Sequence, residues 1–122
     1  KYFYAQALYN LGKTDKAYTE FDEIAAGNQG ERSAEAKYLC CLIKFNKSQY
    51  DEAETETFDL IQNYGEYDYW YAKGFILLAD IYTKTGNEFQ AKQTLQSIID
   101  NYQGQDLKDE AQTKLNALNK NE

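Results

Sequence analysis

The sequence predicts an all-α protein built as a solenoid of helix pairs, and three observations support this. The 122 residues include no proline, and hydrophobic residues recur with the helical period along the chain. No alternating run of β-branched residues bounded by turns is present, as a strand would need. A similar pattern also returns after 36 and then 38 residues. We therefore expect one domain over residues 1–122, a right-handed superhelical α-α solenoid of about three helix–turn–helix repeats plus a C-terminal helix.

Six turn segments divide the chain into seven helical stretches. In chain order the turns fall at 11–15, 26–33, 46–49, 63–68, 84–88 and 101–106. The residues expected at helix N-caps carry a short side-chain oxygen that can accept the free N–H groups of the first turn. They are Asp15 or Thr14, Asp51, Asp68, Asn87 and Asp106. Glycines that can end a helix in a left-handed conformation follow five of the stretches. They are Gly12, Gly27, Gly65, Gly86 and Gly104.

The helical stretches fall into pairs. The first is "KYFYAQALYNLG" (1–12), and its partner runs from the Thr14 region to Gly27. The third contains "AEAKYLCCLIKF" (34–45), and the fourth starts near Asp51. The fifth holds the buried-type run "GFILLA" (74–79), the sixth starts near Asn87, and "DLKDEAQTKLNALNK" (106–120) is the last. We expect units at about 1–29, 30–65 and 66–104, with a last helix at 105–120.

Aligning these pairs brings the same residue types to the same positions. Alanine recurs at Ala17, Ala53 and Ala91, and small residues precede it by twelve positions at Ala5, Cys41 and Ala79. Gly12, Ser48 and Gly86 stand five residues before those alanines. Large residues follow them at Phe21/Ile24, Thr57/Leu60 and Leu95/Ile98, where Thr57 breaks the apolar pattern and Phe58 lies beside it.

This pattern resembles the tetratricopeptide repeat, a helix–turn–helix unit of about 34 residues. The resemblance is carried by Ala79, Tyr82, Gly86 and Ala91, and in the first unit by Ala5, Leu8, Gly12, Ala17 and Phe21. The proline that closes each unit of that family is missing here, and the spacing is longer. Such lengthened units are similar to those of bacterial cell-envelope repeat proteins, which implies a periplasmic or envelope location, with the cytoplasm left open. Because the chain begins inside a helical stretch, we expect it to be part of a longer repeat protein.

The resemblance implies a protein–protein interaction scaffold that binds a protein or peptide through its concave face. In the family, the first helix of each unit lines that face. The positions that correspond here are Tyr9, Tyr38, Leu42, Phe45, Ile76 and Asp80. In the last helix the positions would be Glu110, Thr113 and Ala117.

The aromatic segment "YGEYDYWYAKGF" (64–75) suggests a second kind of site. Two helical stripes through Trp70, Tyr71 and Phe75 predict that these rings are core between neighbouring units. Tyr64, Tyr67 and Tyr69 precede or open the helix, where they could contact a ligand ring. The alternatives are therefore a glycan- or ligand-binding helical scaffold, or a structural spacer with no ligand. A spacer should expose apolar surface on the helix at 1–12, and self-association through that end is a further alternative.

Charge and composition argue against other classes of function. The net charge of −7 would repel a phosphate backbone, so we expect no nucleic-acid partner, and a basic protein surface would be favoured. No apolar run approaches the length of a membrane span. With no histidine and no phosphate-binding loop, we expect no enzyme activity, no cofactor and no metal site. The adjacent Cys40 and Cys41 fall mid-helix and are expected to be buried thiols.

Overall fold

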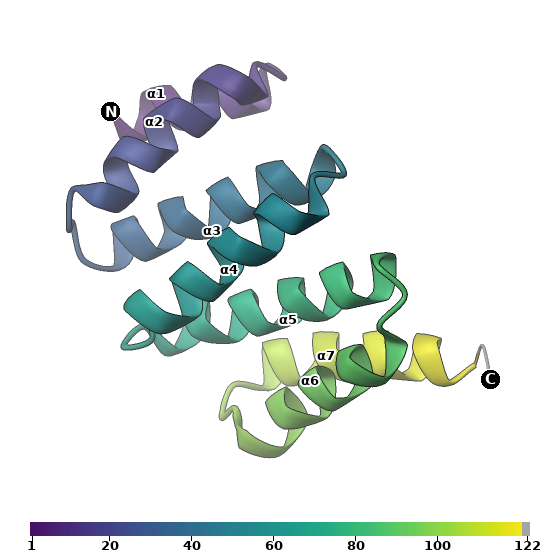
Figure 1. Ribbon diagram of the computed structural model, residues 1–122. Coiled ribbons are helices and arrows are strands. Elements are labelled where there is room, and N and C mark those ends of the chain that lie inside the picture. The colour runs from purple at the N-terminus through teal and green to yellow at the C-terminus, as the bar shows by residue number, and fades with distance from the viewer. Residues whose placement is uncertain (121–122) are drawn as a thin grey trace.

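The computed structural model describes residues 1–120, which form seven α-helices and no strand (Figure 1). The helices are α1 (Tyr2–Asn10), α2 (Thr14–Ala26), α3 (Glu31–Asn46), α4 (Tyr50–Asn63), α5 (Asp68–Lys84), α6 (Glu88–Asn101) and α7 (Gln105–Asn119). The all-α prediction is confirmed. None of these helices is long and apolar enough to cross a membrane.

The helices form two layers in a solenoid-like arrangement. Each helix packs on the next one along the chain, and α2, α4 and α6 lie in front of the other four in Figure 1. α3 also contacts α5, and α5 contacts α7, whereas α2, α4 and α6 make no such contacts with one another in the described part of the chain. Since helices approach one another more closely on the inside of a curved stack, we call α1, α3, α5 and α7 the inner layer. The outer layer is then α2, α4 and α6.

The aligned apolar positions are all buried, so the repeat seen in the sequence is also a repeat of the packing. They are Ala17, Ala53, Ala91, Phe21, Thr57, Leu95, Ile24, Leu60 and Ile98. Thr57 keeps its place in the second unit because its hydroxyl donates to the Ala53 carbonyl at 2.6 Å, which satisfies the buried polar group. The neighbouring Phe58 is exposed instead.

The turns inside the three helix pairs also share one geometry. Gly12, Ser48 and Gly86 have positive φ values of 79°, 62° and 84°. In each case the next residue donates its N–H to the carbonyl five positions earlier, as in the 2.9 Å bond from Lys13 to Leu8. This is the hydrogen-bond pattern of a Schellman motif, which ends a helix with a left-handed residue.

We predict that Ser48→Gly raises the free energy of unfolding by about 0.5–1 kcal/mol, because a side chain is strained at a left-handed φ and glycine is not. Gly86→Ala is the matched control, since a Cβ there would meet nothing within 4 Å and only the backbone strain changes. It should lower the free energy of unfolding by a similar amount. Urea denaturation of both variants tests this, and equal signs for the two changes would contradict the shared turn geometry.

N-caps are predicted for five helices, and only Asn87 lies where predicted, without the side-chain hydrogen bond expected of it. Asn87 is the N-cap of α6, but Thr14, Asp15, Asp51, Asp68 and Asp106 lie inside the first turn of their helices. In the helix pairs, the residue directly after the left-handed one already caps the next helix, so the short turn leaves no room for a later cap. The carboxylates in the first turn still interact favourably with the positive end of the helix dipole.

The seam between the second and third units depends on a close approach of α4 and α5. Gly74 is buried, and a Cβ on it would lie 3.0 Å from Cδ2 of Leu60. The small residue therefore lets the two helices meet. Cys40 and Cys41 are buried and free, which confirms their expected place in the core.

Candidate functional site

The residues predicted to line a concave face lie on the inner layer, but they are not equally accessible. Tyr9, Tyr38, Leu42 and Phe45 are half-buried and pack against the edges of the core clusters. Ile76 is only 3 % exposed and lies in the core formed by α5, α6 and α7. Ile76 is therefore a packing residue and not a surface contact, because α7 covers its side of α5.

Three aromatic rings meet where α3 and α5 lie side by side, and we call Tyr38, Tyr69 and Trp70 the aromatic cluster. The rings of Tyr38 and Trp70 are 5.6 Å apart between centroids, and those of Tyr69 and Trp70 are 4.8 Å apart. The Lys73 ammonium lies 5.2 Å from the Tyr38 ring centroid, within range of a cation–π contact. Tyr69 is 38 % exposed and presents this cluster to solvent.

Charged groups of both signs surround the aromatic cluster. Asp80 of α5 accepts a hydrogen bond from Lys114 of α7 at 3.1 Å. Burial raises the pKa of the Asp80 carboxyl, although Lys114 acts against this. Burial also raises the pKa of the Tyr38 phenol, and the negative charges of Glu110 and Asp80 raise it further. Burial raises the pKa of the Tyr69 phenol as well, and the negative charges of Asp106, Glu110 and Glu35 raise it further. Carboxylates therefore outnumber the two lysines around these rings, which favours a ligand with both apolar and basic groups.

The other two tyrosines predicted as ligand contacts, Tyr64 and Tyr67, have structural roles. The Tyr64 hydroxyl donates to the Ala25 carbonyl at 3.0 Å and so ties the end of α4 to α2. Tyr67 caps α5 and lies over Gly30, the N-cap of α3. The rings of Tyr69 and Trp70 are nearly perpendicular, at 86°, and do not form the coplanar platform that a sugar ring would stack on.

Of the three rings predicted as core, Trp70 and Phe75 are partly buried and Tyr71 is exposed. Trp70 and Phe75 are half-buried, and Trp70 joins the second and third units through Tyr38. Tyr71 is 37 % exposed, although its ring packs edge-on against Phe75 and lies over Gly65. Its assignment to the core is therefore wrong.

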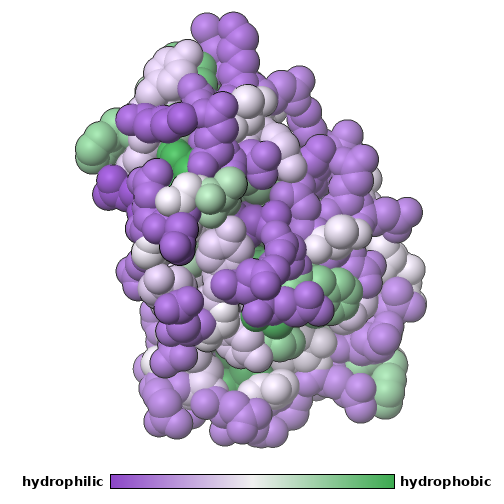
Figure 2. Space-filling model, turned by 60° about the vertical axis from the view of Figure 1, so that its left-hand side comes forward, coloured by the Kyte–Doolittle hydropathy of each residue, from purple (hydrophilic) through white to green (hydrophobic). Residues whose placement is uncertain are grey.

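Hydrophobic residues reach the surface mostly as separate patches among hydrophilic ones on the face drawn in Figure 2. On α1 and the turn after it, Phe3, Tyr4 and Leu11 are exposed. This is the apolar surface that the structural-spacer alternative predicts on the first helix. The Arg32 guanidinium lies 4.1 Å from the Tyr2 ring centroid and covers part of α1.

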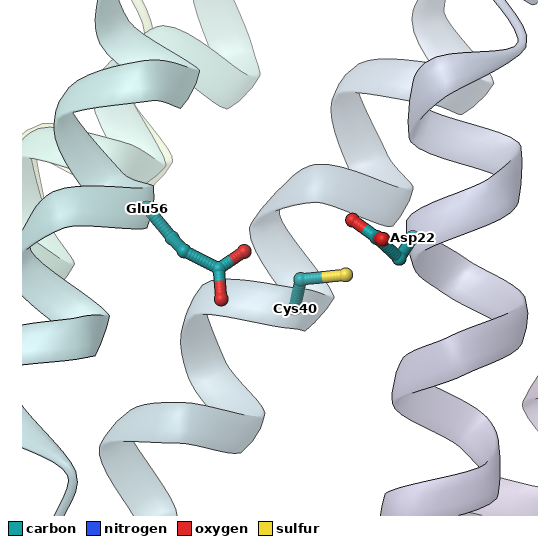
Figure 3. Close-up of side chains that lie close together, drawn as sticks. All are labelled: Asp22, Cys40 and Glu56. Atoms are coloured by element: carbon teal, nitrogen blue, oxygen red, sulfur yellow. The ribbon is translucent and has the colours of Figure 1, made fainter.

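Asp22, Cys40 and Glu56 form a group of side chains that the sequence does not predict. Their ligand atoms lie within 4.8 Å of one another, from α2, α3 and α4. In Figure 3 the Cys40 sulfur points towards Asp22, and the Glu56 carboxylate lies on the other side of the Cys40 side chain. Both Glu56 oxygens are already bonded, one to the Tyr18 hydroxyl at 2.6 Å and one to the Lys37 ammonium at 3.1 Å.

This group fits an ion-pair network better than a metal centre. Metal binding by cysteine needs the thiolate, and burial raises the pKa of the Cys40 thiol far above its usual range. The Lys37 ammonium beside Glu56 would also repel a bound cation. The residues therefore explain the packing of α2, α3 and α4.

The first helix of each pair lies in the inner layer, and α7 joins them there. Lys114 was not among the positions expected in the last helix, because the register of that helix could not be tied to the repeat. Its bond to Asp80 shows that α7 repeats the role of a first helix, packed on α5. Neither a protein-family model nor a curated protein matches this sequence.

Proposed function

We propose that this chain is a tetratricopeptide-like interaction module that binds a protein or peptide across α3 and α5 on its inner layer. The single observation that carries the proposal is the aromatic cluster, which bridges two units and exposes Tyr69 to solvent. Aromatic side chains dominate binding energy at protein interfaces, since they supply a large contact area at low entropy cost. In this proposal the chain has no catalytic role.

The chemistry around the aromatic cluster defines the partner. Half-buried Leu42 and Phe45 lie further along α3. Together with the aromatic cluster they form an apolar strip. Asp80 and Glu110 add negative charge on α5 and α7, in keeping with the net charge of −7. A segment with one or two large apolar residues followed by lysine or arginine would match this strip.

Selection of random dodecapeptides displayed on phage against the immobilised chain provides a test. We expect the selected peptides to be rich in aromatic and basic residues and to shift the emission of Trp70, the only tryptophan. Tyr69→Ala should weaken their binding by roughly tenfold or more, as expected for a central aromatic contact.

Phe89→Ala is the control, since Phe89 is 71 % exposed at the start of α6, beside the opposite end of α5 from Tyr69. It should leave the affinity unchanged. A library that yields no binder, or binders that neither shift the Trp70 emission nor depend on Tyr69, would contradict the proposal and favour a structural spacer.

A further inference from the structure

A cavity of about 440 Å³ lies between α5, the end of α6 and the turn into α7, near Tyr69 of the aromatic cluster. We call it the α6–α7 pocket. Its volume falls within the range of small-ligand sites. Three rings line it, from Tyr71, Phe75 and Tyr102, together with the Asp68 carboxylate and the amide side chains of Asn101 and Gln103.

The corresponding place in the preceding unit is lined by charged side chains. Phe75 and Ser97 occupy the positions that Lys37 and Asp59 hold 38 residues earlier. In the second unit the Lys37 ammonium bonds to Asp59 at 2.9 Å, and this ion pair crosses the gap between α3 and α4. In the third unit a ring and a small hydroxyl replace this ion pair and leave the gap open.

In the second unit a tyrosine also links two helices. Tyr64 stands 38 residues before Tyr102, and its hydroxyl is anchored on the carbonyl of Ala25. The Tyr102 ring lies instead against Gly104, where a Cβ would come within 2.5 Å of Cε2 of that ring. Gly104 therefore allows the ring to form a wall of the pocket.

The walls suit a cation better than a flat neutral ring. The Tyr71 and Phe75 rings are 5.0 Å apart and nearly perpendicular, at 73°, so they form two walls of a corner and no continuous stacking surface. Asp68 contributes a carboxylate, and no lysine or arginine of the described chain lines the pocket. Asp106 lies near enough to help raise the pKa of Tyr102, after the larger effect of burial. Rings and carboxylates together attract an organic ammonium ion through cation–π and Coulomb terms.

We propose that the α6–α7 pocket binds an alkylated ammonium group, carried either by a free small molecule or by a lysine side chain of a partner. The apolar walls hold the alkyl groups, and Asp68 neutralises the charge. No residue of the aromatic cluster lines this pocket, and the proposal does not depend on the function proposed for that cluster.

The test uses choline and its neutral carbon isostere, 3,3-dimethylbutan-1-ol, as matched probes. We expect choline to shift the backbone amide NMR signals of Phe75 and Gly104, and to bind about tenfold more tightly than the isostere, because only choline carries the charge. A peptide with one trimethyllysine distinguishes the sources: tighter binding than choline indicates a protein partner, and weaker binding a free amine.

Two variants test the assignment to this pocket. Asp68→Asn should weaken choline binding, whereas Asp51→Asn, which changes an exposed first-turn acid on α4, should not. Gly104→Ala should displace the Tyr102 ring and also weaken binding. Equal binding of choline and the isostere, or no shift of the two amide signals by choline, would overturn the proposal. Shifts of these signals by glucose but not by choline would overturn it too, and would assign the pocket to neutral polyols.

Discussion

Replacing Phe21 by alanine is expected to lower the free energy of unfolding by about 3–5 kcal/mol, the largest effect of any single change considered for this chain. Phe21 is fully buried between α1, α2 and α3. Its ring packs edge-on against that of Tyr9, with 6.4 Å between the two ring centroids. Removing the ring would leave a cavity that the surrounding helices cannot close. Urea denaturation followed by circular dichroism measures the effect.

Phe58→Ala is the matched control for this change, because it removes the same side chain one position away from the place that corresponds to Phe21. Phe58 is 37 % exposed on α4, while Thr57 fills the buried position. We expect Phe58→Ala to cost about 1 kcal/mol or less. A loss as large as that of Phe21→Ala would show that the units are not packed in the register described.

The second large effect is expected at Lys37, whose ammonium is nearly buried and bonded to Glu56 and Asp59. Lys37→Met should lower the free energy of unfolding by about 3 kcal/mol, because it leaves the Glu56 carboxylate desolvated without its cation. The double variant Lys37→Met/Glu56→Gln removes both charges and should recover most of this loss. If the double variant is less stable than the single one, the ion pair is not what holds α3 against α4.

The pH dependence of stability provides an independent test of the ion pair formed by Lys37. Burial alone would lower the pKa of Lys37, but its hydrogen bonds to Asp59 and Glu56 raise the pKa above the usual range. A raised pKa in the folded state means that the contribution is complete below about pH 10.4 and is lost as the pH rises further. Lys37→Met should therefore flatten the alkaline side of the stability profile.

The change of stability at acidic pH depends on Asp59. Burial alone would raise its pKa, but hydrogen bonds from Lys37 and Asn63 lower it below the usual value. A lowered pKa means that the contribution is present above about pH 3.9 and is lost as the pH falls further. The same urea series, extended to acid, should show this loss in the natural chain and less of it in Lys37→Met.

The fold was predictable because its signals are local and repeated. Ala17, Ala53 and Ala91 mark where paired helices cross, and Gly12 and Gly86 mark the tight turns. Each signal alone is weak, but three aligned copies fix the order of helices. Helix starts were less predictable, because any aspartate near a turn resembles an N-cap. After a Schellman turn the next helix begins at once, so Asp15 and Asp51 lie inside its first turn.

The candidate sites were only partly predictable, because they depend on how three helices meet. The sequence places Tyr38 on the inner layer, but it does not show that α7 buries Ile76. It also does not show that Tyr102, which reads as a turn residue, forms one wall of a pocket with Phe75. Comparison of the second and third units would have pointed to the pocket, since Phe75 stands where Lys37 forms its ion pair.

The most direct test of binding at the inner layer is an NMR titration of the chain with the tightest peptide from the display selection. The indole N–H of Trp70 gives a single signal, because the chain has one tryptophan. Binding at the inner layer predicts that this signal and the amides of Tyr38 and Tyr69 shift together as peptide is added. Shifts confined to α2, α4 and α6, with the Trp70 indole unchanged, would contradict it.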